Sequence, residues 1–269
     1  MGTLFVVATP IGNLEDISRR ALRVLGEVSL IAAEDTRTTR HLLTAFGIKT
    51  PLTSFFEHSG KVKVTRLLEA LDRGDVALVS EAGTPGVSDP GYALIVAAVE
   101  KGVPIVPIPG PSAAATALSI SGLPADQYLF LGFLPRRQSD RLRTLREVAR
   151  LSYTLVMYEA PHRLRASLED LLAVLGPRPL VVCRELTKLH EEIFRGTPSD
   201  ALEHFQSPRG EFTLVLAGST GEEPGAAADA EAMLRELRSR GVGGKVAVAE
   251  VAAATGESRR KLYRLWLGL

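Results

Sequence analysis

The first 118 residues alternate short apolar runs with stretches whose apolar positions recur at helical spacing. The runs are five or six residues long and rich in Val, Ile and Ala, as buried strands are. Strands are predicted at Leu4–Thr9, Val28–Ala33, Val76–Ser80 and Val103–Ile108, and helices at Ser18–Leu25, Thr36–Phe46, Val62–Leu71, Tyr92–Glu100 and from Ser112 onward. Short strands that alternate with helices indicate a parallel sheet with helical crossovers, which is an α/β lobe.

Residues 121–218 show a different order, in which strands follow one another with fewer helices between them. Strands are predicted at Tyr128–Phe133, Thr154–Tyr158, Leu180–Arg184, Glu191–Arg195 and Phe212–Ala217, and helices at Ser139–Arg150, Arg163–Leu175 and near Ser199–Phe205. This order indicates a second lobe with a mixed sheet. Gly122 and Pro124 break the helix that starts at Ser112, so we expect the lobes to span residues 1–120 and 121–218.

Residues 219–269 form a third segment of helical character. Residues 219–228 read STGEEPGAAA, which is the composition of a linker. Helices are predicted at Glu231–Ser239, Val246–Thr255 and Arg259–Leu267. Ala252, Gly256 four residues later and a basic amphipathic helix after the turn match the helix-turn-helix pattern. Residues 229–269 are therefore predicted to be a small helical RNA-binding domain; a helical cap that aids dimerisation is the alternative.

Charge is distributed unevenly along the chain. The 269 residues carry 32 Lys and Arg against 31 Asp and Glu, a formal net charge of +1. Residues 136–150 hold six arginines against two acidic residues, a net of +4; residues 232–269 have a net of +5, and the rest of the chain has −8. A basic segment is the electrostatic mark of a polyanionic partner. The averaged charge conceals two such segments on an acidic body.

The composition places the chain among soluble globular proteins. It is 45% hydrophobic and 23% charged, and no apolar run approaches the roughly 20 residues of a membrane span. The single cysteine, Cys183, lies in the apolar run LVVC and is expected to be a core thiol rather than a catalytic one. A chain that forms no internal disulfide and begins without a signal peptide is predicted to be cytoplasmic, with no membrane association.

Several enzyme classes lack their motifs here. No GxGxxG follows a strand, and neither a phosphate-binding loop, a GxSxG elbow nor an HExxH pair is present. The five histidines show no metal-ligand spacing, so no metal is predicted. Dinucleotide enzymes, P-loop NTPases, serine hydrolases and zinc hydrolases are therefore disfavoured.

Glycine- and proline-rich turns follow several of the predicted strands. They span residues 9–13, 34–37, 80–91, 107–113 and 158–163. In open α/β sheets, ligands bind outside the carboxyl ends of the strands, where glycine lets the backbone approach a ligand. The segment 81–91 is longer than an ordinary connection of 2–6 residues, which favours a functional loop.

These turns carry five motifs in a fixed order: VATPIGNLEDIS, AEDTR, SEAGTPGVSDPG, PIPGPSAA and MYEAPHR. Together they resemble the ribosomal small-subunit RNA cytidine 2′-O-methyltransferases of the tetrapyrrole (corrin/porphyrin) methylase superfamily. The resemblance covers residues 3–218 and extends to the C-terminal helical region. It implies two αβα lobes with S-adenosylmethionine in the cleft between them, and a homodimer that acts on 16S rRNA, either free or within the 30S particle.

The resemblance also implies which residues hold the cofactor: Pro10, Gly83, Thr84, Pro85, Ser112, Ala113, Tyr158 and Glu159. Relatives that modify tetrapyrroles carry Gly-Asp-Pro where this chain has Gly-Thr-Pro, which favours the rRNA branch. The start of the helix at Ser112 favours an anionic group, and Glu81 or Glu159 can complement the sulfonium or bind ribose hydroxyls.

A ribose hydroxyl is a poor nucleophile while neutral, so a general base or a stabilising cation would assist transfer. The candidates are Asp35, Glu81 and Lys188, with Glu34 and His162 behind them. Each has a plainer alternative: Asp35 as an N-cap, Glu81 as a cofactor-binding group, and Lys188 as part of a solvated face.

Arginine and lysine side chains are the candidates for phosphate contact. They are Arg37, Arg137, Arg141, Arg143, Arg146, Arg163, Arg259, Arg260, Lys261 and Arg264. Two other functions stay open at this point. One is a tetrapyrrole C-methyltransferase, which would need an apolar cleft and no RNA-binding appendage. The other is a helix-turn-helix nucleic-acid binder whose α/β body only senses a small ligand.

Overall fold

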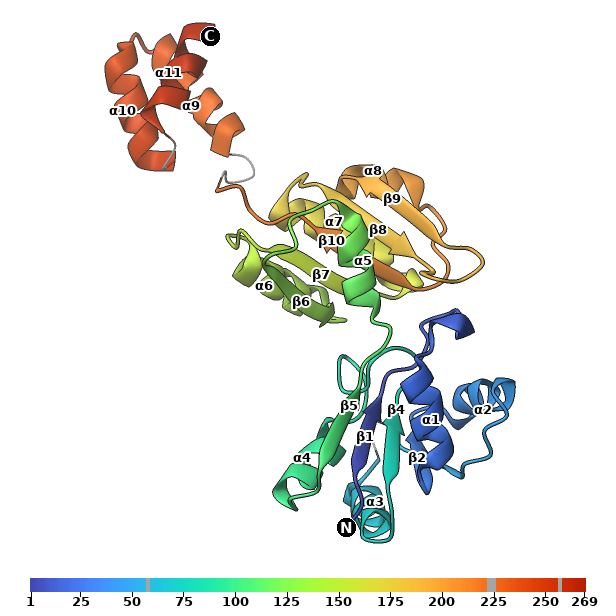
Figure 1. Cartoon of the computed structure of the whole chain (residues 1–269). Coiled ribbons are helices and arrows are strands. Elements are labelled where there is room, and N and C mark those ends of the chain that lie inside the picture. Colours follow the sequence, from blue (N-terminus) through green and yellow to red (C-terminus); the bar gives the residue numbers. More distant parts are fainter. Residues whose placement is uncertain (57–58, 222–225, 256–257) are drawn as a thin grey trace.

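The N-terminal lobe is built on a five-stranded sheet in which every strand is parallel to its neighbours. We describe the protein from a computed structural model that covers residues 1–56, 59–221, 226–255 and 258–269. The strands are β1 (Leu4–Val7), β2 (Leu30–Ala33), β3 (Leu52–Ser54), β4 (Val76–Val79) and β5 (Ile105–Ile108), in the order β3-β2-β4-β1-β5. In Figure 1 the carboxyl ends of β1, β4 and β5 point toward the second lobe, and β2 and β3 are parallel to them.

Helices cover both faces of this sheet. They are α1 (Arg19–Glu27), α2 (Thr36–Ala45), α3 (Lys61–Leu71) and α4 (Tyr92–Glu100), and a 3-10 turn, η1, spans Leu14–Asp16. Alternate residues of β4 face opposite sides: Ala77 and Val79 pack with α1, whereas Val76 and Leu78 pack with α3 and α4. The continuous apolar run of β4 is therefore buried on both faces, as is typical of a parallel strand.

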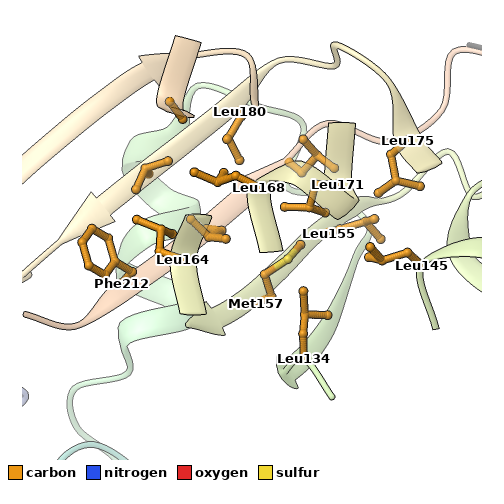
Figure 2. Close-up of a cluster of buried hydrophobic side chains, with 14 of the residues drawn as sticks. Leu134, Leu145, Leu155, Met157, Leu164, Leu168, Leu171, Leu175, Leu180 and Phe212 are labelled. Atoms are coloured by element: carbon orange, nitrogen blue, oxygen red, sulfur yellow. The ribbon is translucent and has the colours of Figure 1, made fainter. Parts of the chain in front are cut away.

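The second lobe has a mixed sheet, as predicted. Its strands are β6 (Tyr128–Phe133), β7 (Thr154–Glu159), β8 (Leu180–Arg184), β9 (Glu192–Gly196) and β10 (Phe212–Leu216), in the order β6-β7-β10-β8-β9. Only β6 and β7 run parallel; the other three pairs are antiparallel. On one face lie α6 (Gln138–Val148), α7 (Pro161–Leu175) and α8 (Pro198–His204). Figure 2 shows the leucines of α7 pointing into this core, which includes Met157 and Phe212.

The opposite face of that sheet is covered by α5 (Ala113–Ser121). Ala114, Ala117 and Leu118 pack on Val156 and Val215. Helix α5 therefore packs with the second lobe, although the sequence expectation placed it in the first. Gly122 does end the helix, in a left-handed conformation with φ 74°, but the chain crosses between lobes before α5, at residues 109–112. Both lobes are three-layered αβα units, so the predicted fold class is confirmed.

The C-terminal helices form a unit with its own core. They are α9 (Ala226–Ser239), α10 (Gly244–Thr255) and α11 (Arg259–Gly268). Leu234, Val251 and Leu262 are at the centre of this core, which shares no residue with the cores of the lobes. Figure 1 shows the three helices standing away from the lobes. The predicted turn residue Gly256 lies outside the described residues, and α9 begins inside the segment 219–228 that was expected to be a linker.

Two further differences from the sequence prediction are small. Strand β3 and the turn η1 were not predicted, because three residues are too few to show a periodic pattern. Across the described ranges, no helix is both long and apolar enough to cross a bilayer.

Candidate active site between the lobes

A cavity of about 340 Å³ lies where the carboxyl edge of the first sheet meets the second lobe. The first lobe contributes Ile11 and the loop after β4; the second contributes the start of α5 and the ends of β7, β8 and β10. Its lining includes Gly83, Thr84, Ser112, Ala113, Tyr158 and Glu159, which are six of the eight residues expected to hold the cofactor. Of the other two, Pro10 lines an adjoining pocket, and Pro85 is buried and lines neither.

The long loop after β4 is shaped by residues in left-handed conformations. Gly83 has φ 81°, and its N–H and C=O pair with the backbone of Thr9 at 3.1 and 2.9 Å. Gly86, Ser88 and Gly91 also have positive φ. Positive φ at Ser88, which is not glycine, is uncommon and costs conformational energy. This loop is therefore fixed in a shape that brings its backbone to the edge of the cavity.

Tyr158 ties β7 to the start of α5. Its hydroxyl accepts a hydrogen bond from the Ala114 N–H at 3.2 Å, in the first turn of the helix that Ser112 caps. The Tyr158 ring packs edge-on against Phe130 and Phe133. Burial raises the pKa of this hydroxyl, which stays protonated at neutral pH. Tyr158 thus forms a rigid wall of the cavity and orients the helix N-terminus.

Glu159 lines the cavity, but its carboxylate is already bound within the protein. Its Oε1 accepts from the Ala160 N–H at 2.9 Å, and its Oε2 accepts from the Ser167 hydroxyl. The Arg163 guanidinium lies 3.4 Å from Oε1, measured from Nε. Glu159 is only 1% exposed. Its role is therefore to hold the end of β7 in place, and the Arg163 charge compensates its burial.

The cavity has an acidic wall formed by Glu34, Glu81, Asp89 and Glu211. Burial, the charge of Glu34 and the charge of Asp35 raise the pKa of Glu81. Burial and the charge of Glu34 raise the pKa of Asp89 to about 7. Sequence reasoning missed Asp89 as a site residue, although it stands inside the quoted motif SEAGTPGVSDPG. Its position between Ser88 and Pro90, in the longest loop at the sheet edge, was the available signal.

The three catalytic candidates have different surroundings. Glu81 faces the cavity. Asp35 does not line it: the side chain caps α2, accepts from the N–H of Arg37 and pairs with its guanidinium at 2.9 Å. These bonds lower the pKa of Asp35 to about 2, so it is a poor proton acceptor. Lys188 pairs with Glu185 and Glu211 at 2.9 and 2.8 Å. Burial by itself would lower the pKa of Lys188. The hydrogen bonds to the two carboxylates have the larger effect, so the pKa of Lys188 is raised above its ordinary value.

Two remaining residues have plainer roles. His162 is exposed in the first turn of α7 and does not line the cavity. Cys183 lines the cavity, but burial raises the pKa of its thiol to about 11, so it is protonated and unreactive, as expected of a core thiol. Among the described residues, no group of three or more His, Cys, Asp or Glu side chains is arranged to hold a metal ion.

Two of the arginines proposed for phosphate contact are structural instead. Arg141 is 4% exposed and is bound to Asp170, with 2.6 Å between Nη2 and Oδ2. It also donates to the carbonyls of Pro135 and Arg136. Arg163 binds Glu159 and donates to the carbonyls of Leu134 and Pro135. The spacing of the arginines in the sequence predicted that Arg141 lies on an exposed basic face of the helix. In the structure this side chain points toward α7 and is buried there.

Because Arg141 and Asp170 are buried together, removing one partner leaves an uncompensated charge. We expect Asp170→Ala to lower the free energy of unfolding by about 3–5 kcal/mol, whereas Arg141→Met with Asp170→Leu recovers most of the loss. Urea denaturation monitored by circular dichroism measures both variants. A stability of Asp170→Ala within about 1 kcal/mol of wild type would contradict the structural role of this pair.

The other predicted RNA contacts are on the surface. Arg143 and Arg146 are exposed on α6 and Arg137 is exposed at its N-cap; Arg143 pairs with Asp140 at 3.0 Å. Arg259, Arg260 and Arg264 are exposed along α11, and Lys261 is half-buried beside them. Arg37 is exposed at the start of α2 and pairs with Asp35.

Comparison with known proteins matches this architecture to one family. The family model described as Tetrapyrrole (Corrin/Porphyrin) Methylases matches residues 3–202. The chain belongs to this family. A second model, described as the RsmI C-terminal HTH domain, matches residues 224–269. The family resemblance stated from the motifs is confirmed, and so is the prediction of a methyltransferase.

Among similar members, two curated relatives are named Ribosomal RNA small subunit methyltransferase I. The one from Synechocystis is 45% identical and covers 100% of this chain and 99% of its own length. The one from Thermotoga maritima is 47% identical and covers 81% of this chain and 99% of its own length. The second relative is therefore shorter than this chain, by about the size of the C-terminal helical unit.

Two solved structures have a similar fold. The methyltransferase CobJ has a TM-score of 0.64 at 19% identity, covering 81% of this chain and 95% of its own. A uroporphyrin-III C-methyltransferase from Thermus thermophilus, solved with S-adenosylhomocysteine, has a TM-score of 0.55 at 21% identity, covering 80% and 97%. These likenesses establish the fold.

Proposed function

We propose that the protein transfers a methyl group from S-adenosylmethionine to the ribose 2′-hydroxyl of a cytidine in small-subunit (16S) rRNA. Two observations together support this proposal: the cavity between the two lobes, and a relative over the whole length of the chain that is named for small-subunit rRNA methylation. The cytidine and the 2′-hydroxyl come from the resemblance of the five ordered motifs to the rRNA branch of the family.

The residues around the cavity suit S-adenosylmethionine. A volume of about 340 Å³ lies within the range of small-ligand sites. The acidic wall can complement a sulfonium cation, and the N-terminus of α5 at Ser112 can complement a carboxylate. The glycine at position 83 leaves the backbone of the loop open to close approach. Gly83, Thr84, Ser112, Ala113 and Tyr158 would hold the cofactor.

When bound, the cofactor supplies a methyl group on a positively charged sulfur, which becomes a neutral thioether once the methyl has left. The acceptor oxygen gains the methyl group and must release its proton. Glu81 is placed to accept that proton, because it lies in the cavity wall and its raised pKa makes its carboxylate a better base than an ordinary one. In-line alignment of the reacting groups supplies much of the rate of such a transfer, and a cavity lined by both lobes would provide it.

RNA reaches the cavity over the segment between β6 and α6. Phe133 lines the cavity and is 52% exposed, so it lies at the opening. Arg136 and Arg137 follow three and four residues later and are exposed. Arg141 and Arg163 donate hydrogen bonds to the carbonyls of residues 135 and 136, and so fix the backbone of this segment. The buried arginines thus fix the segment from which the exposed ones can contact phosphates.

Asp89 makes cofactor binding depend on pH. Its pKa of about 7 means that the carboxylate gains charge as the pH rises through 7. A cationic ligand favours the ionised form, so we expect affinity for S-adenosylmethionine to increase between pH 6 and pH 8. Asp89→Asn should bind about 3- to 10-fold more weakly at pH 8 and lack most of this pH dependence. Calorimetric titration of wild type and Asp89→Asn at several pH values measures the affinity and its pH dependence. Equal pH profiles for the two proteins would contradict the role of Asp89 in cofactor binding.

The two rival functions are less well supported. A tetrapyrrole C-methyltransferase does not account for the basic helix α11 or for curated relatives named for rRNA. A ligand-sensing nucleic-acid binder does not account for relatives named as methyltransferases over the whole length of the chain. We also propose that the enzyme is a cytoplasmic homodimer, on the resemblance to the family; light scattering after gel filtration tests the dimer.

The test of the proposed function is transfer of tritiated methyl groups. The purified protein is incubated with labelled S-adenosylmethionine and, separately, with 30S particles, free 16S rRNA and a tetrapyrrole. We expect label in RNA, from the particle or from free rRNA. Label in the tetrapyrrole alone would favour the rival enzyme, and cofactor binding without transfer to any RNA would favour the sensor.

A further inference from the structure

A second pocket, of about 280 Å³, adjoins the first on the side of the N-terminal lobe. The two share Ile11, Glu81, Ala82 and Glu211 as a common wall. A group-transfer enzyme needs two binding sites that meet at the reacting atoms. The second pocket occupies the position such a site requires, because Glu81, the proton acceptor proposed above, stands in the wall between the two.

The pocket has a buried hydroxyl without a partner. Thr9 is 3% exposed and lines the pocket, and its Oγ1 has no hydrogen-bond partner among the described residues. Its backbone pairs with Gly83, which lines the first cavity. Buried hydroxyls in native proteins are nearly always satisfied, so an unpartnered one calls for an explanation. A polar ligand in the pocket would supply the missing partner.

Lys188 is fixed beside this pocket by a turn with unusual backbone angles. Glu185 and Thr187 both have positive φ, 51° and 67°, although neither is glycine. Such strained residues persist where the surroundings determine them, and they cluster at ligand-binding sites. A Cβ on Gly12 would lie only 2.4 Å from Cγ of Lys188, so the loop after β1 leaves room for this side chain. Both the turn at residues 185–187 and the absence of a side chain at Gly12 therefore fix the position of the Lys188 side chain.

We propose that this second pocket binds the acceptor nucleotide as a single unstacked cytidine; the inference rests on the proposed function. Enzymes that do chemistry on a base extrude the nucleotide from the stack and read its pairing edge in a pocket. The same extrusion would bring a ribose hydroxyl to a cavity between two lobes. The pocket is of a size for one nucleoside rather than a macrocycle. Cytosine presents an amine donor at N4, which a carboxylate accepts.

The polar groups of the pocket match that edge. Glu211, on the shared wall, accepts from Lys188 through Oε2 and has acceptor capacity left for the N4 amine. Lys188, His41 and the hydroxyl of Thr9 offer donors to the cytosine N3 and O2 acceptors. Uracil carries a carbonyl in place of the amine and would direct its oxygen against the carboxylate. The pocket therefore accepts cytidine and rejects uridine.

The test compares two threonines of similar burial in the full-length enzyme. Thr9→Val removes the unpartnered hydroxyl, whereas Thr154→Val removes a hydroxyl that donates to the Pro124 carbonyl at 2.6 Å, at the far end of β7. With 30S particles or rRNA as substrate, we expect Thr9→Val to lower kcat/KM for RNA by at least tenfold. Its melting temperature should stay unchanged or rise, and its cofactor Kd should stay within twofold. Thr154→Val should show the reverse: a lower melting temperature and a kcat/KM within twofold of wild type.

A second variant tests base selectivity. Glu211→Gln presents an amide that can donate as well as accept, so it should narrow the preference for cytidine over uridine at the modified position by at least tenfold. Substrates that differ only in that nucleotide measure this. If the wild type methylates RNA but neither Thr9→Val nor Glu211→Gln changes kcat/KM or selectivity, the pocket assignment is wrong and the proposed function stands. If the wild type methylates no RNA, both are wrong.

Discussion

Replacing Gly83 by valine is expected to weaken binding of S-adenosylmethionine by about 100-fold or more. Gly83 has φ 81°, a conformation that a β-branched residue adopts only at considerable cost. A Cβ at this position would lie 3.6 Å from the Ile11 side chain and 3.9 Å from the Pro111 carbonyl oxygen, and because Gly83 lines the cavity, the added methyl groups would take up space at its wall. The substitution therefore both strains the loop and fills space that the cofactor needs.

Gly86→Val is the matched control for this experiment. Gly86 has the same φ of 81° but does not line the cavity. Gly86→Val introduces a β-branched residue at the same φ, so it should lower the melting temperature about as much as Gly83→Val does. Its cofactor affinity should stay within a few-fold of wild type. Isothermal titration calorimetry gives both affinities. Normal binding by Gly83→Val would remove the loop from the cofactor site.

Deleting residues 222–269 is expected to weaken RNA binding by about 10- to 100-fold and to leave turnover at saturating RNA largely intact. Three exposed arginines on α11, at 259, 260 and 264, are lost with this segment. If each neutralises one phosphate of single-stranded RNA, the slope of log affinity against log salt falls by about 2. The cavity is formed by the lobes alone, and the shorter Thermotoga maritima relative carries the same name over 81% of this chain.

The full-length protein with Arg259, Arg260 and Arg264 replaced by alanine is the control for this deletion. It keeps the helical unit and its core, because the side chains at these positions are exposed. We expect the same reduction in salt slope as in the truncated protein, measured by filter binding at several salt concentrations. An unchanged RNA affinity in both proteins would contradict an RNA-binding role for the C-terminal helices.

Much of the fold could be predicted because strand and helix patterns are local. The run Val76–Ser80 could be identified as a buried parallel strand from its own composition, and β4 covers Val76–Val79. The position of the cavity followed as well, since turns after parallel strands gather at one edge. That edge brings Gly83 of the first lobe to the cavity, and the carboxyl end of β7 in the second lobe brings Tyr158 to it.

Roles that depend on distant partners could not be predicted. Arg141 belongs to an arginine-rich helix, and only the fold shows that Asp170, 29 residues away, buries and neutralises it. Arg163 is similar, because its partner Glu159 becomes buried only when α7 packs on the sheet. The chain crosses between the lobes before α5 because the small apolar face of α5 covers the second sheet. The residues of the helix alone do not specify which of the two sheets that face covers.

The chemical identity of the product tests the central claim most directly. 16S rRNA, free or in 30S particles, is treated with the enzyme and S-adenosylmethionine that carries a deuterated methyl group, then digested to nucleosides and analysed by mass spectrometry. The proposed function predicts the label in 2′-O-methylcytidine, with the mass shift on the ribose fragment and at one position in the RNA. Label on a base, or no label in RNA under conditions where the cofactor binds, would contradict it.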